Sequence, residues 1–178
     1  LEGEGEVLAK VHEPYFNRTY GHFCGHKNTP FKSESASYPA LIKQGNVLCF
    51  AHPIFSAYDK SGSYVLERYI KKAFDSIYEK GIKTENLPSC GRVRFRKSEK
   101  EDFFALHILY APPVNRGNVC LLEDFPVLHD VKITVKVDKK ITSAVSQPDG
   151  ESIEFVQNGN EVSFELSPFS LHKLVILK

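Results

Sequence analysis

Residues 131–137 read VKITVKV, with Val or Ile at every odd position and Lys or Thr between them. A period of two directs all the apolar side chains to one face of a strand, the pattern of an antiparallel sheet with one face in water. Two other segments, 103–110 (FFALHILY) and 170–178 (SLHKLVILK), are apolar on nearly both faces. Central strands of a two-layer stack have this pattern, so the three segments together predict a β-sandwich.

Shorter segments around these three support the same fold. Further strands are expected at 92–97, 119–122 and 141–145. Asn158-Gly159 suits a type I′ hairpin turn, which would pair Gln157 with Asn160 and Phe155 with Val162. We therefore predict that 89–178 form an antiparallel β-sandwich of about seven or eight strands, with no helix after Gly81.

The first half of the chain has a different pattern. Residues 47–51 (VLCFA) are a continuous apolar run, as expected of a strand covered on both faces. A helix is expected next, because apolar residues recur at steps of three and four between Leu66 and Ile77, after a capping Ser61 or Ser63. Strand and helix predict an α/β segment over 1–88, ending in a linker at 81–91 (GIKTENLPSCG). The predicted fold class is thus α+β.

The composition excludes several kinds of partner. The 23 Lys and Arg residues nearly balance the 22 Asp and Glu residues and are scattered, so we expect no nucleic-acid partner. The apolar runs are of strand length, well short of the roughly 18 residues of a membrane span, so no membrane partner is expected. Four widely spaced cysteines favour free thiols. The chain has no Met and opens at Leu1, which suggests a piece of a longer protein.

The segment 13–30 (EPYFNRTYGHFCGHKNTP) concentrates reactive side chains where neither helical nor strand periodicity is present. In an extended backbone His22, Cys24 and His26 would lie on one side and could bind zinc with a fourth ligand. The alternative is loop histidines that bond to backbone or to a neighbouring surface. No C-x-x-C or H-x-x-x-H motif accompanies them, so we expect no metal and no cofactor.

A second candidate centre is His52-Pro53, directly after an apolar strand. This placement resembles the His-Pro-Glu of class I glutamine amidotransferases, in which the glutamate orients the histidine toward a nucleophilic cysteine. Here Ile54 replaces the glutamate, and neither Cys24 nor Cys49 lies on a G-x-C-x-G turn. The resemblance therefore implies an amidotransferase-like, flavodoxin-like fold without its catalysis.

Other polar residues have simpler interpretations. Glu123 and Asp124 are adjacent, so on a strand they would point to opposite faces and could not form the acid pair of a glycosidase. His107 and His172 are expected to be core or interface histidines. An arginine row, Arg92, Arg94 and Arg96, alternates with apolar residues and indicates the solvent face of an edge strand.

Three segments together resemble a known architecture: 13–30, 38–58 (YPALIKQGNVLCFAHPIFSAY) and 106–135 (LHILYAPPVNRGNVCLLEDFPVLHDVKITV). They are similar to the C-terminal portion of bacterial glycoside hydrolases that carry a β-galactosidase trimerisation domain, such as family 42 β-galactosidases and related α-L-fucosidases. In that architecture a (β/α)8 barrel holds the catalytic carboxylates, an amidotransferase-like domain builds the oligomer, and a β-sandwich closes the chain. The resemblance implies no catalytic residue here. The residues it suggests for a sugar funnel or a subunit contact are Asn17, Arg18, His22, His26 and His52.

The leading hypothesis is a non-catalytic C-terminal accessory and oligomerisation region of a glycoside hydrolase. Its expected partners are a second copy, the parent catalytic barrel and a carbohydrate. One alternative is a carbohydrate-binding β-sandwich module, and another is a small metal- or thiol-dependent enzyme that uses His22, Cys24 and His26. The compartment is not indicated, with a cytoplasmic location slightly favoured.

Overall fold

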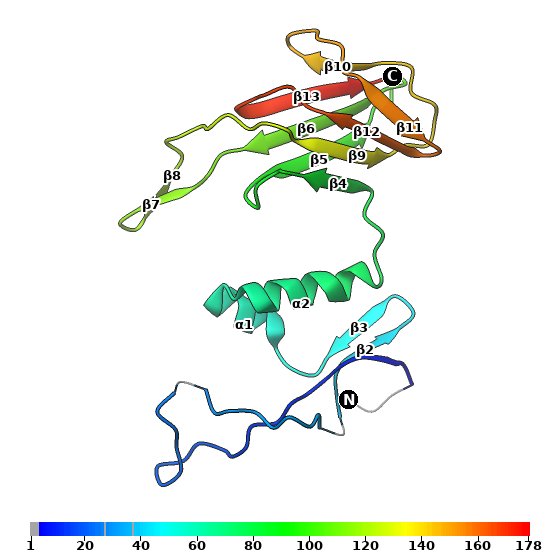
Figure 1. Cartoon of the computed structure of the whole chain (residues 1–178). Coiled ribbons are helices and arrows are strands. Elements are labelled where there is room, and N and C mark those ends of the chain that lie inside the picture. Colours follow the sequence, from blue (N-terminus) through cyan, green and yellow to red (C-terminus); the bar gives the residue numbers. More distant parts are fainter. Residues whose placement is uncertain (1–3, 27, 37) are drawn as a thin grey trace. The chain divides into compact units, whose positions relative to one another are not determined.

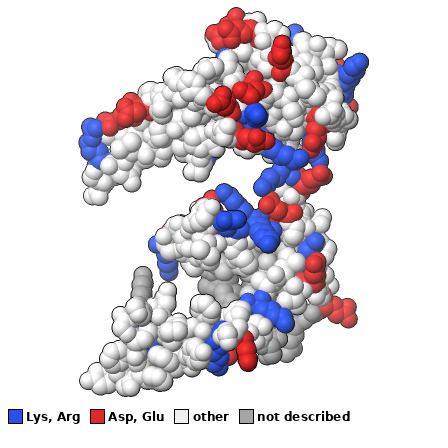
Figure 2. Space-filling model, viewed as in Figure 1, with Lys and Arg blue, Asp and Glu red and all other residues white. Residues whose placement is uncertain are grey.

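The computed structural model describes residues 4–26, 28–36 and 38–178. The chain divides into two compact units, Leu1–Glu79 and Lys80–Lys178 (Figure 1). Lys and Arg side chains are interspersed with Asp and Glu on the visible surface of each unit (Figure 2).

The second unit is a β-sandwich of two antiparallel four-stranded sheets. One sheet has the order β10-β13-β6-β5, with β5 Arg92–Lys97, β6 Phe104–Tyr110, β10 Ala144–Gln147 and β13 Leu171–Leu177. The other has the order β11-β12-β9-β4, with β4 Ile82–Glu85, β9 Lys132–Lys136, β11 Phe155–Asn158 and β12 Glu161–Glu165. A separate hairpin joins β7 Val114–Arg116 to β8 Val119–Leu121.

The hydrophobic pattern of the sequence accounts for the core of this unit. Val131, Ile133, Val135 and Val137 are all buried, which confirms the alternation predicted for VKITVKV. The two segments that are apolar on both faces form the central strands β6 and β13, and the arginine row lies on the edge strand β5. Burial of this apolar surface is the main stabilising contribution to the unit.

The hairpin β11–β12 forms, but its predicted register is wrong. Phe155 pairs with Phe164 and Asn158 with Glu161, so the two turn residues are Gly159 and Asn160. Gly159 has a φ of +60° at the first turn position and Asn160 has no positive φ at the second, which is the combination of a type II′ turn. The shift leaves the same side chains on the same face, so the hydrophobic pattern could not distinguish the two registers.

The segment 81–91, expected as a linker, contributes strand β4 instead. Ile82 pairs with Val135 of β9, and its side chain packs against the buried core. The segment 119–122 also differs from expectation, because β8 pairs only with β7 and lies outside the two sheets of the sandwich. Turn-forming residues such as Asn86 and Pro88 directly follow β4, so the sequence pattern predicted a linker here and not a strand.

The first unit corrects the predicted fold class. Its sheet is antiparallel, with the order β1-β2-β3, in which β1 is Glu6–Lys10, β2 Pro39–Gln44 and β3 Val47–Phe50. The sheets of the chain are antiparallel throughout and dominate its structure, and no flavodoxin-like or amidotransferase-like α/β segment is evident in the described residues. Gly45, with a φ of +57°, reverses the chain directly between β2 and β3. The predicted doubly covered strand is therefore the edge strand of a hairpin, and Val47 is 59% exposed.

Two helices follow this sheet: α1, Ile54–Ser61, and α2, Tyr64–Asp75. The helix predicted from its apolar spacing is α2, and Ser63 lies at its N-cap position without a side-chain capping bond. Edge-to-face ring contacts join the helices to β3, with Phe50 at 5.4 Å from Phe55 and 5.9 Å from Tyr69 between ring centroids. In the described residues neither helix is long and apolar enough to cross a membrane.

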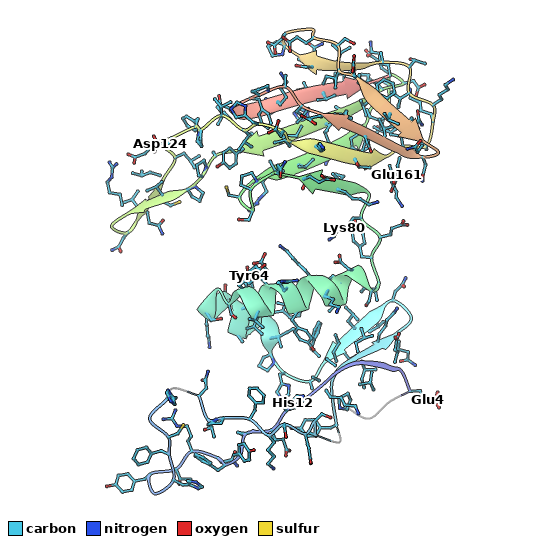
Figure 3. All side chains as sticks on the ribbon, in the orientation of Figure 1. Glu4, His12, Tyr64, Lys80, Asp124 and Glu161 are labelled. Carbon is cyan, nitrogen blue, oxygen red and sulfur yellow. The ribbon has the colours of Figure 1, made fainter. Side chains whose placement is uncertain are left out.

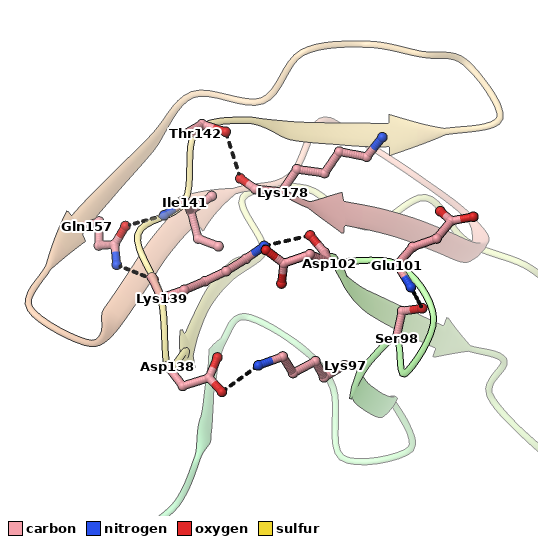
Figure 4. A network of polar contacts seen from close by, with 10 residues as sticks. All are labelled: Lys97, Ser98, Glu101, Asp102, Asp138, Lys139, Ile141, Thr142, Gln157 and Lys178. Carbon is pink, nitrogen blue, oxygen red and sulfur yellow. Dashed lines mark hydrogen bonds and ion pairs between the residues drawn. The ribbon is translucent and has the colours of Figure 1, made fainter.

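A polar network connects the β5–β6 hairpin of the second unit with the chain between β9 and β10 (Figure 4). Lys97 Nζ lies 2.7 Å from Asp138 Oδ2, and Lys139 Nζ lies 2.8 Å from Asp102 Oδ2. Both ammonium groups lie within 6 Å of the centroid of the Phe104 ring, a distance at which a cation is attracted to the ring. The hydrogen bond from Lys97 lowers the pKa of Asp138 and raises the pKa of Lys97 itself.

Candidate functional site

The arm, residues 11–36, connects β1 to β2 and carries four of the five candidate residues. Its two sides are joined by backbone hydrogen bonds, from Tyr15 N to Pro30 O at 2.9 Å and from Lys32 N to Glu13 O at 2.8 Å. At the base, His12 Nδ1 lies 3.0 Å from Lys32 O (Figure 3 labels His12). These bonds join the two sides of the arm, and its described residues, 11–26 and 28–36, belong to no helix or named strand.

A tight turn forms one end of the arm. Thr19 and His22 exchange two backbone hydrogen bonds, of 2.9 and 3.2 Å, around Tyr20 and Gly21. The imidazole of His22 lies parallel to the ring of Phe16, with a centroid separation of 3.8 Å and an interplanar angle of 12°. The turn and the stack together orient His22, while the side chain of Tyr20 is fully exposed.

Contacts around Cys24 order the next part of the arm. Arg18 Nη2 donates to the carbonyl oxygen of Cys24 at 3.5 Å. The Cys24 thiol donates to the carbonyl oxygens of His26 at 3.5 Å and Asn28 at 3.6 Å. The arm thus brings Arg18, His22 and His26 into one segment, with Asn17 exposed between Phe16 and Arg18.

His52 lies elsewhere in the first unit. It is exposed in the short segment between β3 and α1, where its carbonyl oxygen accepts a 2.8 Å hydrogen bond from Ile54 N. In the described residues no hydrogen bond joins its side chain to the arm. Four of the five candidates therefore share one segment, and His52 is a separate feature at the start of a helix.

The geometry does not assemble the zinc or thiol centres considered from the sequence. The His22 ring is stacked on Phe16, and the Cys24 thiol points to backbone carbonyls. Among the described residues there is no group of three or more His, Cys, Asp or Glu side chains that could hold a metal ion. Among the residues that the structure describes, no hydrogen bond joins the Cys24 thiol to an imidazole. The arm instead exposes hydrogen-bonding groups and aromatic rings to solvent.

Exposed aromatic side chains are a feature of the arm that the five candidate residues do not include. Tyr15, Tyr20, Phe23 and Phe31 are all more than 60% exposed. Singly scattered exposed rings are ordinary, but four in one segment favour an interaction surface, because large apolar rings are better covered than left in water. The signal in the sequence was the density of aromatic residues in a segment with no periodicity.

The second unit carries shallow surface grooves. One, of about 570 Å³, lies along β11 and β12 and is lined by Glu151, Glu154, Phe155 and Glu165, among others. Glu165 of this groove lies 3.9 Å from Lys132. In the separate β7–β8 region, Glu123 is paired with Arg116. Of the two adjacent acids, Glu123 is thus held in a surface ion pair.

Comparisons with known proteins identify a similar solved structure. No protein-family model matches the chain, and no curated protein sequence matches it. Among solved structures the chain is similar to the α-L-fucosidase isoenzyme 2 from Paenibacillus thiaminolyticus, with 26% sequence identity and a TM-score of 0.89. The match covers 98% of this chain and 27% of the fucosidase, so the chain spans about a quarter of that enzyme. It supports a fold related to a glycoside hydrolase, whereas a family 42 β-galactosidase relationship and a trimerisation domain are not supported.

Proposed function

We propose that this chain is an accessory region of a larger glycoside hydrolase related to α-L-fucosidases, and that it follows a catalytic domain in the same polypeptide. The observation that carries the proposal is the match along 98% of this chain to 27% of an α-L-fucosidase. A region that occupies a quarter of an enzyme and contains a β-sandwich is of the size expected for one or two accessory domains.

We assign the region no acid and base of its own. Glycoside hydrolysis requires two carboxylates on opposite sides of a sugar, about 5 to 10 Å apart. The candidate residues of the first unit, Asn17, Arg18, His22, His26 and His52, include no carboxylate. They can donate hydrogen bonds to sugar hydroxyls or to a protein surface, which suits binding and positioning.

The arm is the part of the region that we assign to sugar or partner contact. Its tip presents Tyr20 and Phe23 to solvent, and the stack on Phe16 orients His22. Aromatic rings pack on the apolar faces of sugars, while imidazole and guanidinium groups bond to hydroxyls, so this combination suits the wall of a sugar site built by another domain.

Self-association is the second role that we propose for the first unit. Its buried hydrophobic residues are few, and among the described residues they are Leu41, Ile42 and Ala73. In contrast, Phe55, Tyr64, Val65 and Phe74 of its helices are 45% exposed or more. A unit with so little internal burial gains stability when a second copy or a catalytic domain covers these side chains.

A chimera tests the proposal directly. In the chimera, this chain replaces the matching segment of the Paenibacillus fucosidase. In a second variant of the fucosidase, the same segment is deleted. We expect the chimera to hydrolyse an aryl α-L-fucoside and the deletion variant to have lost most activity. This chain alone should hydrolyse neither aryl fucosides nor aryl galactosides. Enzyme-like turnover by the isolated chain, or a folded chimera no more active than the deletion variant, would overturn the proposal.

A carbohydrate-binding module remains a second candidate because of the groove along β11 and β12. Its carboxylates and the serine hydroxyls of Ser152, Ser163 and Ser167 could bond to sugar hydroxyls, and Phe155 could pack on a ring. Calorimetric titration with fucosyl and galactosyl oligosaccharides distinguishes this role. Saturable binding that is lost in Glu154→Ala would favour it, and an absence of heat would exclude those sugars.

A further inference from the structure

Three arginines form a row on the outer face of one sheet of the sandwich. Arg92, Arg94 and Arg96 alternate along the edge strand β5 with Val93 and Phe95, which pack against the core. All three arginines are exposed, and a step of two residues along a strand is about 6.6 to 6.8 Å. The row therefore places positive charges at regular intervals along one side of this face.

These charges are not neutralised within the sandwich. Among the residues that the structure describes, no carboxylate forms an ion pair with any arginine of the row. Arg92 donates to the carbonyl oxygens of Ser89 at 3.2 Å and Gly91 at 3.1 Å, which are neutral partners. Lys97, the next residue of the strand, is in contrast paired with Asp138. The positive charge of the row is thus available to an anion from outside.

Two histidines lie beside this row on the same face. His107 of β6 is the cross-strand partner of Arg94, and His172 of β13 is the diagonal neighbour of His107; the three strands are adjacent in the sheet (Figure 1). His107 Nδ1 lies 3.2 Å from His172 Nε2, and the ring centroids lie 5.4 Å apart with planes that differ by 18°. Both nitrogens therefore lie between the centroids, and one hydrogen bond joins the rings head-on.

The hydrogen bond between the rings determines what their outer nitrogens, His107 Nε2 and His172 Nδ1, can do. A neutral imidazole has one N–H and one lone pair, so the donating ring has a bare outer nitrogen and the accepting ring has an outer N–H. When the pair takes up one proton, the bare nitrogen is the one that receives it. Both outer nitrogens are then donors, and the pair carries a positive charge beside the arginine row.

We propose that this face binds oxyanion groups, such as sulfate or carboxylate, that are carried by an acidic glycan. The residues that would hold them form the basic face: Arg92, Arg94, Arg96, His107 and His172. A guanidinium group binds an oxyanion through two parallel N–H bonds, and the outer N–H groups of the imidazole pair add donors on the neighbouring strands. Other residues of the face on β6, β13 and β10 are apolar or Gln, so no carboxylate of these strands competes with the ligand.

An acidic glycan fits the basic face better than a second copy of the chain does. A second copy that paired its own β5 with this edge would set two arginine rows side by side, and like charges that face each other destabilise strand pairs. A sugar ring also needs apolar surface among the charges. Leu109, which is 49% exposed, lies between Arg92 and His172 and provides it. The choice of a glycan rests on the proposed function as a region of a glycoside hydrolase.

Calorimetric titration of the full chain with dextran sulfate at low ionic strength tests the site, and unsulfated dextran of the same length is the control ligand. We expect saturable binding of the sulfated polymer alone. Arg94→Gln with Arg96→Gln should weaken this binding by about tenfold or more, because each substitution removes a charge-assisted hydrogen bond. Arg68→Gln with Lys72→Gln removes the same charge from exposed positions of α2 and should leave binding nearly unchanged.

The histidines give a readout that the arginines alone would not give. Binding should strengthen as the pH falls from about 8 to about 6, because imidazoles gain protons in this range while Arg92 and Arg94, the charged neighbours of the pair on this face, stay charged. His107→Gln with His172→Gln should remove the pH dependence. His129→Gln, at an exposed histidine of the same unit, should retain it.

Equal binding by the β5 and α2 variants would overturn the proposal, and the arginine row would then serve only to protect the edge strand from aggregation. Binding of poly-L-glutamate as tight as that of dextran sulfate would also overturn it, since the ligand would then be an acidic protein segment. The fucosidase chimera separates this proposal from the proposed function, because its hydrolysis of a neutral aryl α-L-fucoside does not depend on the basic face. Hydrolysis without binding of dextran sulfate would remove the glycan site alone.

Discussion

The side-chain carbonyl of Gln157 accepts a 2.8 Å hydrogen bond from the backbone N–H of Ile141, a residue that is itself buried. The Nε2 of the same amide donates to the carbonyl oxygens of Lys139 at 3.0 Å and Gly159 at 3.1 Å (Figure 4 shows the bonds to residues 139 and 141). One side chain of β11 thus satisfies three backbone groups in the β9–β10 connection and in its own hairpin.

Gln157→Leu should lower the free energy of unfolding by about 1 to 3 kcal/mol, because it leaves a buried N–H without an acceptor. Chemical denaturation measures the change. Val156→Leu introduces the same side chain on the exposed face of the same strand and should have little effect. Equal stability of the two variants would show that the amide does not support this connection.

Leu106 and Leu109 of β6 allow a matched test of the sandwich core. Leu106 is fully buried, whereas Leu109 is 49% exposed on the opposite face. Leu106→Ala should cost about 2 to 5 kcal/mol through lost burial and the cavity that remains. Leu109→Ala should cost clearly less. Thermal unfolding of both variants gives the comparison, and a reversed order would contradict the assigned faces.

Gly159 should resist substitution because its φ of +60° is unfavourable for residues with a Cβ atom. Gly159→Ala is expected to destabilise the second unit by about 1 to 2 kcal/mol. Gly81→Ala is the control, since an added Cβ there meets no atom within 4 Å and its φ is not in the left-handed region. If both alanines were tolerated equally, the type II′ turn would be wrong.

The ion pair of Lys97 and Asp138 predicts an acid-sensitive contribution to stability. The hydrogen bond from Lys97 lowers the pKa of Asp138 in the folded chain, so its stabilising effect is present above the unfolded value near pH 4 and is lost as the pH falls below it. Lys97→Met should therefore flatten the decline in stability between about pH 5 and pH 3. The pair is exposed, so 0.5 M NaCl should reduce the difference between the variants. An unchanged pH profile in Lys97→Met would rule out this contribution.

Tyr64 and Val65 of α2 test the proposed self-association of the first unit. Both side chains are exposed, and their replacement by Ser should leave the fold intact. Light scattering at tens of micromolar should show an oligomer for the unsubstituted chain and a smaller species for Tyr64→Ser with Val65→Ser. Val156→Ser, at an exposed position of the second unit, serves as the control. A monomer in every case would remove the proposal of self-association.

Local pattern predicted the second unit well because one physical rule, the burial of every second residue, acts along VKITVKV and along the two central strands. It failed in the first unit, where the five-residue apolar run 47–51 cannot reveal whether the neighbouring strand is parallel or antiparallel. The chain reverses at Gly45 because this residue has a positive φ. In the sequence, however, the same Gly-Asn pair could equally have preceded a new strand without a reversal. Strand β2 was not predicted either, because its first residue, Pro39, is of a type that usually indicates a turn or loop.

The sequence selected the residues of the candidate site by their composition, whereas their geometry could not be predicted and their role stays a proposal. The unusual composition of residues 13–30 pointed to the arm, and four of the five candidates lie on it. The stack of His22 on Phe16 and the bond from Arg18 to the Cys24 carbonyl depend on the course of the backbone, which no periodic pattern describes. The separation of His52 from these residues likewise depends on tertiary structure.

The tight turn at Thr19–His22 leaves Tyr20 fully exposed in a chain that contains no tryptophan. A tryptophan introduced there, as Tyr20→Trp, would be the sole indole fluorophore of the protein. Its emission would begin red-shifted, as for a ring in water, and would move to shorter wavelength when any surface closed over the arm. The fold thus provides an optical reporter for whatever the arm contacts.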